Sequence, residues 1–392
     1  METTKPIEME LSERLGGVGE YYFSKKLREI DDMRAAGREI INLGIGSPDR
    51  PPHPDVIAAL SREAARSDRH GYQPYKGTAV LREAFARWYG ERYGVRLDPS
   101  TEILPLIGSK EGIMHVCMTY LNEGDRVLIP NPGYPTYRSA ATIAGGVCVD
   151  YRLRESNGWM PDFDEIERGG MDGIKMMIVN YPHMPTGAAP KEGLFRRLVD
   201  FARKHRILLV HDNPYSFLRN ARPESLLAVP GAMDVAVELN SLSKSHCMAG
   251  WRIGMIGAAR ERIDEIIRFK SNMDSGMFYP MQAAAAVALA LGDAWYDELN
   301  ALYRRREALA YGILDAVGCS YDPSQAGLFV WGRLPEGRGD CYAFTDDILR
   351  MCGVFLTPGE IFGSEGDRYI RISLCATEET LRRASDKIRE AL

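Results

Sequence analysis

The segment S-L-S-K-S-H-C-M-A-G-W-R-I-G, residues 241–254, places Lys244 and Arg252 eight residues apart among serines and glycines. An apolar run, residues 234–240, precedes it and is expected to form a sheet strand. A lysine at the end of such a strand, partly removed from water and near a second cation, has a lowered pKa and becomes nucleophilic. Lys244 is therefore a candidate for forming a Schiff base with an aldehyde, although a lysine among serines also fits a solvated loop.

Two stretches of the sequence predict a phosphate site. The hydroxyls of Ser241 and Ser243 and the planar guanidinium of Arg252 are donors suited to an anionic phosphate. The apolar strand 103–107 runs into a Gly-Ser turn and then a helix, whose first N–H groups and positive dipole end favour an anion. The amides expected to bind phosphate there are those of Gly108, Ser109 and Lys110.

Two loops at predicted strand ends offer contacts to a flat ligand. Gly46, in the run I-N-L-G-I-G-S-P-D, lets the backbone approach a ligand closely, although a plain turn explains it equally well. Tyr134, in the run P-G-Y-P-T-Y, is placed to lie flat on a heterocycle. The neighbouring Tyr137 is expected to be structural.

Two charged residues stand in or next to apolar strands. Asp212 follows the apolar run 207–211 and either caps the next turn or faces a ligand. Arg371 lies inside the predicted strand 369–373, where it either faces solvent from a sheet edge or meets an anion.

Composition narrows the class of protein. The chain has 392 residues, enough for two cores, and a formal net charge of -5, which argues against a nucleic-acid surface. Its seven cysteines are scattered without metal-ligand spacing, and no apolar run of about 18 residues occurs. We expect a cytoplasmic protein that acts on small molecules and binds neither membrane nor metal.

Strands alternate with helices over residues 103–260, which predicts an α/β fold with a mostly parallel sheet. We expect residues 50–280 to form this large domain. Residues 1–49 and 281–392 are expected to form a smaller α+β domain. The stretch 283–291 is predicted to open a long helix that bridges the two.

Taken in order, these motifs resemble the class I/II aminotransferases, fold-type-I enzymes that use pyridoxal 5'-phosphate. The resemblance rests on S-x-S-K, G-W-R-I-G, D-x-x-Y, the Gly-Ser helix start and the late arginine, and it covers about residues 41–374. The I-N-L-G-I-G-S-P-D run and the D-S-G-x-F loop also resemble, more weakly, the LL-diaminopimelate aminotransferases of that family.

The resemblance implies a role for each matching residue. Lys244 would hold the cofactor as a Schiff base and, once free, act as the base at the substrate Cα. Asp212 would contact the pyridinium nitrogen, Tyr215 the phenolic oxygen, and Tyr134 the pyridine face. Arg371 would bind the substrate carboxylate.

Further implied roles concern the substrate and a second subunit. Gly46 would lie against the substrate carboxylate, Phe278 would line the pocket, and Tyr72 would reach the phosphate of a partner subunit, which implies a homodimer with shared sites. One position departs from the family pattern: Met184 stands where the family has an asparagine that donates to the phenolic oxygen. His183 beside it either faces the substrate or lies at the surface.

The predicted reaction moves an amino group between an amino acid and a 2-oxo acid by a ping-pong mechanism. A pyridoxal-phosphate lyase or racemase of the same fold is the alternative. A regulatory module that binds the cofactor without turnover is a second alternative. The retention of Lys244, and the lack of room for a DNA-binding domain before residue 41, weigh against it.

Overall fold

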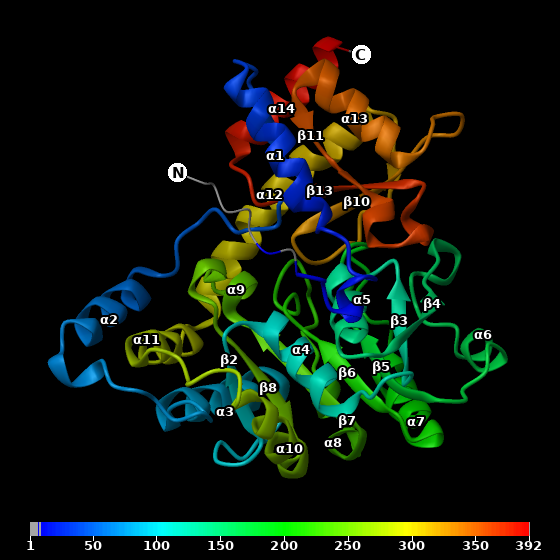
Figure 1. Cartoon of the computed structure of the whole chain (residues 1–392). Helices are drawn as coiled ribbons and strands as arrows, with labels where there is room; N and C mark the ends of the chain where they lie inside the picture. Colours follow the sequence, from blue (N-terminus) through cyan, green and yellow to red (C-terminus); the bar gives the residue numbers. More distant parts are fainter. Residues whose placement is uncertain (1–6, 8, 392) are drawn as a thin grey trace.

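The computed structural model describes residues 7 and 9–391. Two sheets organise the chain, a large one low in Figure 1 and a smaller one above it, and helix α12 rises from the first toward the second. Within the described residues, no helix is both long and apolar enough to span a membrane.

The large sheet has seven strands in the order β2-β8-β7-β6-β5-β3-β4. Strand β8 pairs antiparallel with β2 and β7, and the other neighbours pair in parallel, so the predicted mixed, mostly parallel sheet is confirmed. Their bounds are β2 Ile103–Leu106, β3 Arg126–Asn131, β4 Val147–Arg152, β5 Ile174–Val179, β6 Leu208–Asp212, β7 Ala236–Ser241 and β8 Gly254–Ala258.

Helices cover both faces of this sheet, which is why its central strands are mostly apolar and buried along nearly their whole length. Because successive side chains of a strand point to opposite faces, Met176 and Ile178 of β5 join one core cluster and Met177 and Val179 the other. One face is covered by α4 Ser109–Tyr120, α5 Pro135–Ile143 and α10 Arg260–Lys270. The other is covered by α3 Ala79–Tyr93, α7 Leu194–His205 and α11 Tyr279–Leu289.

The small sheet is antiparallel and has the order β12-β13-β10-β9. Its strands are β9 Ser320–Tyr321, β10 Phe329–Arg333, β12 Thr357–Pro358 and β13 Tyr369–Ser373. Beside it lie α1 Tyr22–Ala35, α12 Asp293–Ala316, α13 Cys341–Cys352 and α14 Glu378–Ala391. Strand β1 (Ile41–Asn42) pairs in parallel with β11 (Val354–Phe355), which joins the start of the chain to its end.

We call these two assemblies the large-sheet part (β2 to β8 with their helices) and the small-sheet part (β1, β9 to β13, α1 and α12 to α14). The remaining short helices are α2 Pro54–Ala64, α6 Phe163–Arg168, α8 Ala232–Val235 and α9 Leu242–Ser245. The 3-10 helices are η1 Glu13–Leu15, η2 Ser67–Arg69, η3 Glu155–Asn157, η4 Leu226–Ala228, η5 Ala249–Trp251, η6 Gly359–Phe362 and η7 Ser364–Gly366.

The single long helix expected from residue 283 is wrong, because two helices occupy that stretch. Helix α11 ends at Leu289 and packs against α2 and α3, whereas α12 begins at Asp293 and packs against α14. Gly292 between them is extended, and Asp293 puts an acidic side chain in the first turn of α12, which favours a new helix start.

A carboxylate is buried in the large-sheet part without contact to solvent. Glu238 of β7 accepts hydrogen bonds from the Tyr89 hydroxyl (2.9 Å), the Ser225 hydroxyl (2.8 Å) and the Leu226 amide (2.8 Å). Its Oε2 also lies 2.8 Å from Nδ1 of His211. Four donors from three separate segments, α3, residues 225–226 and β6, therefore depend on one carboxylate.

Glu238→Gln is expected to lower the free energy of unfolding by about 3–5 kcal/mol, because an amide leaves two of the four donors facing an NH₂ group. The measurement is the thermal unfolding midpoint. Asp234→Asn, which breaks the exposed ion pair with Arg203, is the matched control and should shift the midpoint far less. Equal shifts in both variants would contradict this account.

Candidate active site

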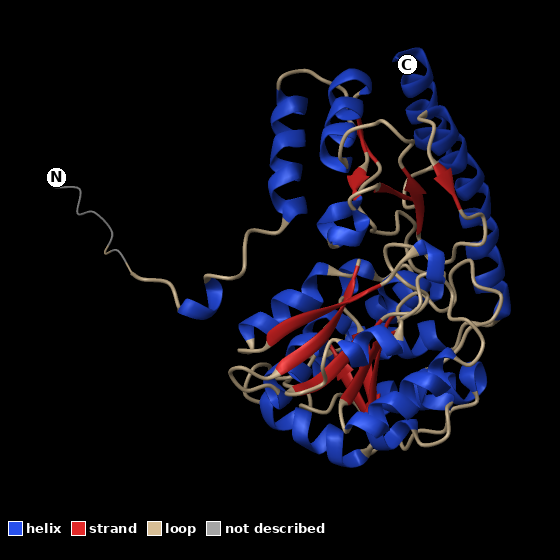
Figure 2. Ribbon diagram, turned by 90° about the vertical axis from the view of Figure 1, so that its right-hand side faces the viewer, coloured by secondary structure: helices blue, strands red, loops and turns tan. Residues whose placement is uncertain are grey.

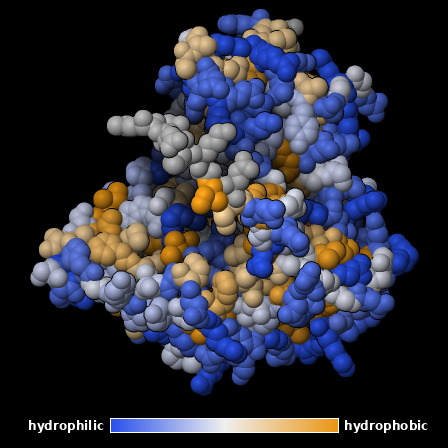
Figure 3. All heavy atoms as spheres, in the orientation of Figure 1, coloured by the Kyte–Doolittle hydropathy of each residue, from blue (hydrophilic) through white to orange (hydrophobic). Residues whose placement is uncertain are grey.

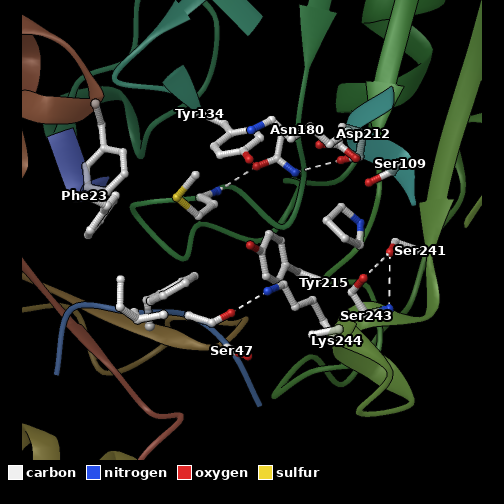
Figure 4. Close-up of a pocket in the computed structure, with 18 of the residues that line it drawn as sticks. Phe23, Ser47, Ser109, Tyr134, Asn180, Asp212, Tyr215, Ser241, Ser243 and Lys244 are labelled. Atoms are coloured by element: carbon white, nitrogen blue, oxygen red, sulfur yellow. Dashed lines mark hydrogen bonds between the residues drawn. The ribbon is translucent and has the colours of Figure 1, made fainter. Parts of the chain in front are cut away.

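A cavity of about 600 Å³ opens at the edge of the large sheet where β5, β6 and β7 end. Figure 4 shows Lys244, Tyr215, Tyr134 and Asp212 around it. The predicted site residues that line it are Gly46, Ser109, Lys110, Tyr134, Asp212, Tyr215, Ser241, Ser243, Lys244, Arg252 and Arg371.

Lys244 lies in α9, directly after β7. The hydroxyl of Ser241 caps this short helix by accepting a hydrogen bond from the Ser243 amide (3.2 Å). Nζ of Lys244 donates to the carbonyl oxygen of Gly46. Burial lowers the pKa of Lys244 below its usual value, and the charges of Arg371 and Arg252 lower it further. The free amine is therefore more accessible here than at the surface.

Asp212 ends β6 and is 5% exposed. Its Oδ2 accepts a hydrogen bond from the Tyr137 hydroxyl (2.8 Å), while the buried Oδ1 has no partner in the described part of the chain. Burial raises the pKa of Asp212 from 3.8 to about 6, against the opposing effects of Tyr137 and His211. A positively charged N–H donor would give Oδ1 a hydrogen-bond partner and would stabilise the ionised form of Asp212.

Two neighbours of Asp212 were not predicted as site residues. Tyr137, expected to be structural, lines the cavity and bonds Asp212. Asn180, at the end of β5, lines it too, and its Nδ2 donates to the main-chain oxygen of Asp212 (2.7 Å). The sequence position of Asn180 could have indicated its place in the site, because a polar residue directly after an apolar strand lies at the same sheet edge as Asp212.

The predicted phosphate donors meet at the start of α4. Gly108 has a φ of 79°, and a Cβ added to it would collide with the guanidinium of Arg252. Nη1 of Arg252 donates to the hydroxyl of Ser243 (3.3 Å) and to the Ala249 carbonyl oxygen (2.8 Å). Together with the free amides of the first turn of α4, these donors form a concave cradle that suits a phosphate.

Arg371 is a buried cation on β13, inside the small sheet rather than at its edge. Its Nη2 donates to the Gly44 carbonyl oxygen (2.7 Å), and Nε has no partner in the described residues. Three aromatic rings surround the guanidinium, with Cζ 3.8 Å from the ring centre of Phe329, 4.6 Å from Phe362 and 5.7 Å from Phe23. Burial lowers the pKa of Arg371 to about 10, so it remains charged near neutral pH. The sequence left two alternatives for Arg371, a side chain that faces solvent from a sheet edge or one that meets an anion. Its buried place inside the sheet favours the anion.

Met184 lies against this arginine. Its Sδ is 3.2 Å from Nη1 of Arg371, and its main-chain amide donates to Oδ1 of Asn180 (2.8 Å). His183 is buried outside the cavity lining, with Nδ1 2.8 Å from the Thr186 hydroxyl, so its predicted placement at the surface is wrong. Burial lowers the pKa of His183 to about 3 and keeps it neutral.

Three predicted site residues are not part of the cavity lining: Gly108, which packs against Arg252, and Tyr72 and Phe278. Tyr72 is 93% exposed, and Phe278 is 38% exposed with its ring centre 5.6 Å from that of His70. Tyr72 lies on the segment between α2 and α3, and Phe278 lies in the loop before α11, so neither lines the cavity of its own chain.

The residues present fit a pyridine aldehyde that carries a phosphate. The unpaired Oδ1 of Asp212 matches a ring N–H, the cradle at Gly108 matches the phosphate, and Lys244 matches the aldehyde. Tyr134, half-buried in the same lining, offers a ring face. Such a site at the edge of an α/β sheet defines a fold-type-I pyridoxal-phosphate enzyme.

Comparison with known proteins places the chain within that class. Residues 38–388 match the family Aminotransferase class I and II, so the chain belongs to this family of pyridoxal-phosphate-dependent aminotransferases. The predicted fold, cofactor and reaction are confirmed. The lyase or racemase alternative gains no support.

Its relatives are similar over nearly their whole length. The chain is 41% identical to the LL-diaminopimelate aminotransferase of Oleidesulfovibrio alaskensis, over 96% of this chain and 98% of the relative. BacF from Bacillus subtilis has a TM-score of 0.94 at 34% identity, over 98% of this chain and 99% of BacF. A mutant of Thermus thermophilus aspartate aminotransferase has a TM-score of 0.91 at 25% identity, over 98% of this chain and 100% of that chain.

The raised pKa of Asp212 predicts a dependence of stability on pH in the cofactor-free protein. The stability linked to the protonated carboxyl is present below about pH 4 and is lost as pH rises through about 6, because the unfolded chain gives up this proton first. Cofactor-free Asp212→Asn lacks this loss and should be more stable than the wild type at about pH 8, by on the order of 3 kcal/mol. At about pH 4 the two should be similar.

Thermal unfolding of both cofactor-free proteins across this pH range provides the measurement. Taking the difference between them cancels the titration of other groups. A difference that does not change with pH would mean that Asp212 keeps an ordinary pKa.

Proposed function

We propose that this aminotransferase takes LL-diaminopimelate, or an amino acid much like it, as its amino donor and a 2-oxo acid as its acceptor. The observation that supports this proposal most is the identity of 41% with an LL-diaminopimelate aminotransferase across nearly the full length of both chains. The aspartate aminotransferase named above is less similar, at 25% identity.

When bound, the cofactor supplies an electron sink for the charge that develops at the substrate Cα. We assign its binding to Asp212 at the ring nitrogen, Tyr215 at the phenolic oxygen and Tyr134 at the ring face. The phosphate is assigned to the hydroxyls and guanidinium after β7 and to the first turn of α4, that is to Ser241, Ser243, Arg252, Gly108, Ser109 and Lys110. Their arrangement around one cavity supports these assignments.

Proton transfer is assigned to Lys244. Its amine, with a pKa lowered by burial, removes the proton from the substrate Cα and later returns one. The Gly46 carbonyl that Nζ contacts holds the amine toward the cavity. Met184 offers no donor to the phenolic oxygen, so Tyr215 is the only side chain that we assign there.

The substrate α-carboxylate is assigned to Arg371. A buried guanidinium that lacks a carboxylate partner among the described residues, and has Nε free, is suited to bind a carboxylate through two parallel hydrogen bonds. Gly46, which belongs to the same lining, leaves room beside it.

A homodimer is also proposed, with Tyr72 and Phe278 of one subunit serving the cavity of the other. Their exposure supports a contact with a second copy, as do the exposed Tyr75 and Ile57 in the same region. Figure 3 shows hydrophobic side chains gathered over α2, on the left of the view.

Two expectations on organisation and location are kept as proposals. We divide the chain into a large domain, 50–280, and a small domain of 1–49 with 281–392, and the packing of α11 against α2 and α3 favours moving the second boundary to Gly292. A cytoplasmic location is supported by the free state of all seven cysteines.

Arg371→Ala should raise the KM for the amino donor more than a hundredfold and change the dissociation constant of pyridoxal phosphate little. Loss of one side of a buried charge pair costs about 3–5 kcal/mol. Steady-state kinetics and a cofactor titration measure the two effects. The control is Arg333→Ala, a half-exposed arginine of the same sheet, which should leave KM unchanged. Loss of cofactor affinity equal to the rise in KM would argue for a structural role of Arg371.

The donor itself is tested by mixing the loaded enzyme with a panel of amino acids and following the cofactor absorbance. LL-diaminopimelate should convert the cofactor fastest, at least about tenfold ahead of aspartate, tyrosine and alanine. Lys244→Ala should show no conversion with any donor, because the other lysine in the described lining, Lys110, is assigned to the phosphate and not to the aldehyde. Faster conversion by another amino acid would refute the proposed substrate while leaving the aminotransferase assignment intact.

A further inference from the structure

Arg219 is a buried arginine in the loop that follows β6, and the mechanism above gives it no part. Its side chain is 1% exposed. Its backbone has a φ of 52°, in the left-handed region that residues with a Cβ rarely adopt. A charged side chain that is both buried and held on an unfavourable backbone calls for a structural or functional reason.

The guanidinium of Arg219 belongs to the large-sheet part, but its acceptors belong to the small-sheet part. Nη1 donates to the main-chain oxygens of Phe329 (3.1 Å) and Gly327 (3.4 Å). Nη2 donates to the main-chain oxygen of Gln325 (2.6 Å) and to the carboxylate of Glu307 on α12. One side chain therefore binds three alternate carbonyls, those of residues 325, 327 and 329, in the turn 325–329, which leads into β10.

The backbone around Arg219 is fixed to the same elements. Asn300 of α12 accepts a hydrogen bond from the Arg219 amide (2.7 Å) and donates to the Phe217 carbonyl oxygen (2.9 Å). The Gly327 amide donates to the Leu218 carbonyl oxygen (2.7 Å). The loop 217–219 and the turn 325–329 thus hold each other in register.

This turn ends in Phe329, which forms part of the wall of the active-site cavity. The ring of Phe329 lies 3.8 Å from Cζ of Arg371, and its centre is 6.2 Å from that of Tyr215. A Cβ added at Gly46 would collide with the same ring. The carbonyl oxygen that accepts from Arg219 and the ring that covers Arg371 belong to one residue, so a shift of the turn moves the ring.

We propose that Arg219 is a positioning residue for the carboxylate site, which it maintains by fixing the turn 325–329 so that Phe329 stays against Arg371. The inference depends on the proposed role of Arg371 in binding the substrate carboxylate. It assigns no contact between Arg219 and substrate or cofactor. Its effect should therefore fall on recognition of the carboxylate and spare cofactor binding, whose residues lie in the large-sheet part.

The test compares two substrates of the loaded enzyme: the amino acid that the wild type accepts best and the amine that lacks its α-carboxyl group. The first half-reaction is followed by the cofactor absorbance. Arg219→Met should lower the second-order rate constant for the amino acid about tenfold or more, and leave that for the amine within about twofold. Arg219→Lys keeps the charge but lacks the planar fork that reaches three carbonyls, so its loss should be smaller and of the same kind.

The effect of lost stability alone is controlled with Ile263→Ala. This variant opens a cavity where α10 packs on the large sheet, in the part of the molecule that does not contain the turn 325–329. It should lower the unfolding midpoint without changing the ratio of the two rate constants. Should Arg219→Met fail to fold, Arg219→Lys and Glu307→Gln, which removes the carboxylate partner of Arg219, carry the same comparison.

Arg371→Ala distinguishes the inference from the function on which it rests. If Arg371→Ala leaves the preference for the amino acid over the amine unchanged, the proposed carboxylate site is wrong. If Arg371→Ala abolishes that preference and folded Arg219 variants retain it, only the role of Arg219 is overturned. An equal loss for both substrates in the Arg219 variants would also overturn it.

Discussion

Three charged groups that line one cavity constrain the rest of this molecule. Asp212 and Arg371 are buried and Lys244 is partly buried, and within the described residues none has an ion-pair partner. Burying a charge without a partner costs free energy, which the apolar core of both parts must offset. On the proposed assignments, the cost would be relieved by a ligand that brings a cationic ring N–H to Asp212 and a carboxylate to Arg371. Stability of the ligand-free chain and affinity for ligand would therefore be opposed at these two residues.

The large sheet and the residues at its edge could be predicted from the sequence because their signals are local. Each central strand is a mostly apolar run, and Asp212 and Lys244 stand at or just after the ends of two such runs. In a parallel sheet these ends must lie at one edge. The resemblance to aminotransferases then gave each residue a role that the residue types alone left open. Gly108 was predictable for the same reason, since a strand, a turn and a helix start are all visible in the sequence.

The residues that were missed depend on contacts between distant segments. Tyr137 reaches Asp212 only because α5 begins at Pro135 and turns its hydroxyl toward β6, which no pattern near Tyr137 specifies. The break between α11 and α12 rests on Gly292 within an alanine-rich stretch that favours continuing a helix. Arg219 stands in a loop without a motif of its own, and its acceptors lie about a hundred positions further along the chain. The role of Tyr72 was predicted from the family resemblance, in which the matching tyrosine acts across subunits. Within a single chain Tyr72 does not line the cavity.

The hydrogen bond between Lys244 and Gly46 has a consequence for motion. Gly46 follows β1, which pairs with β11, so its carbonyl is carried by the small-sheet part, while Lys244 is carried by the large-sheet part. On the proposed assignment, covalent attachment of Lys244 to the cofactor aldehyde would take away the N–H donors that make this bond. Lys244 would then tether the two parts only while its amine is free. Relative movement of the two parts would in this way depend on the bonding state of a single nitrogen atom.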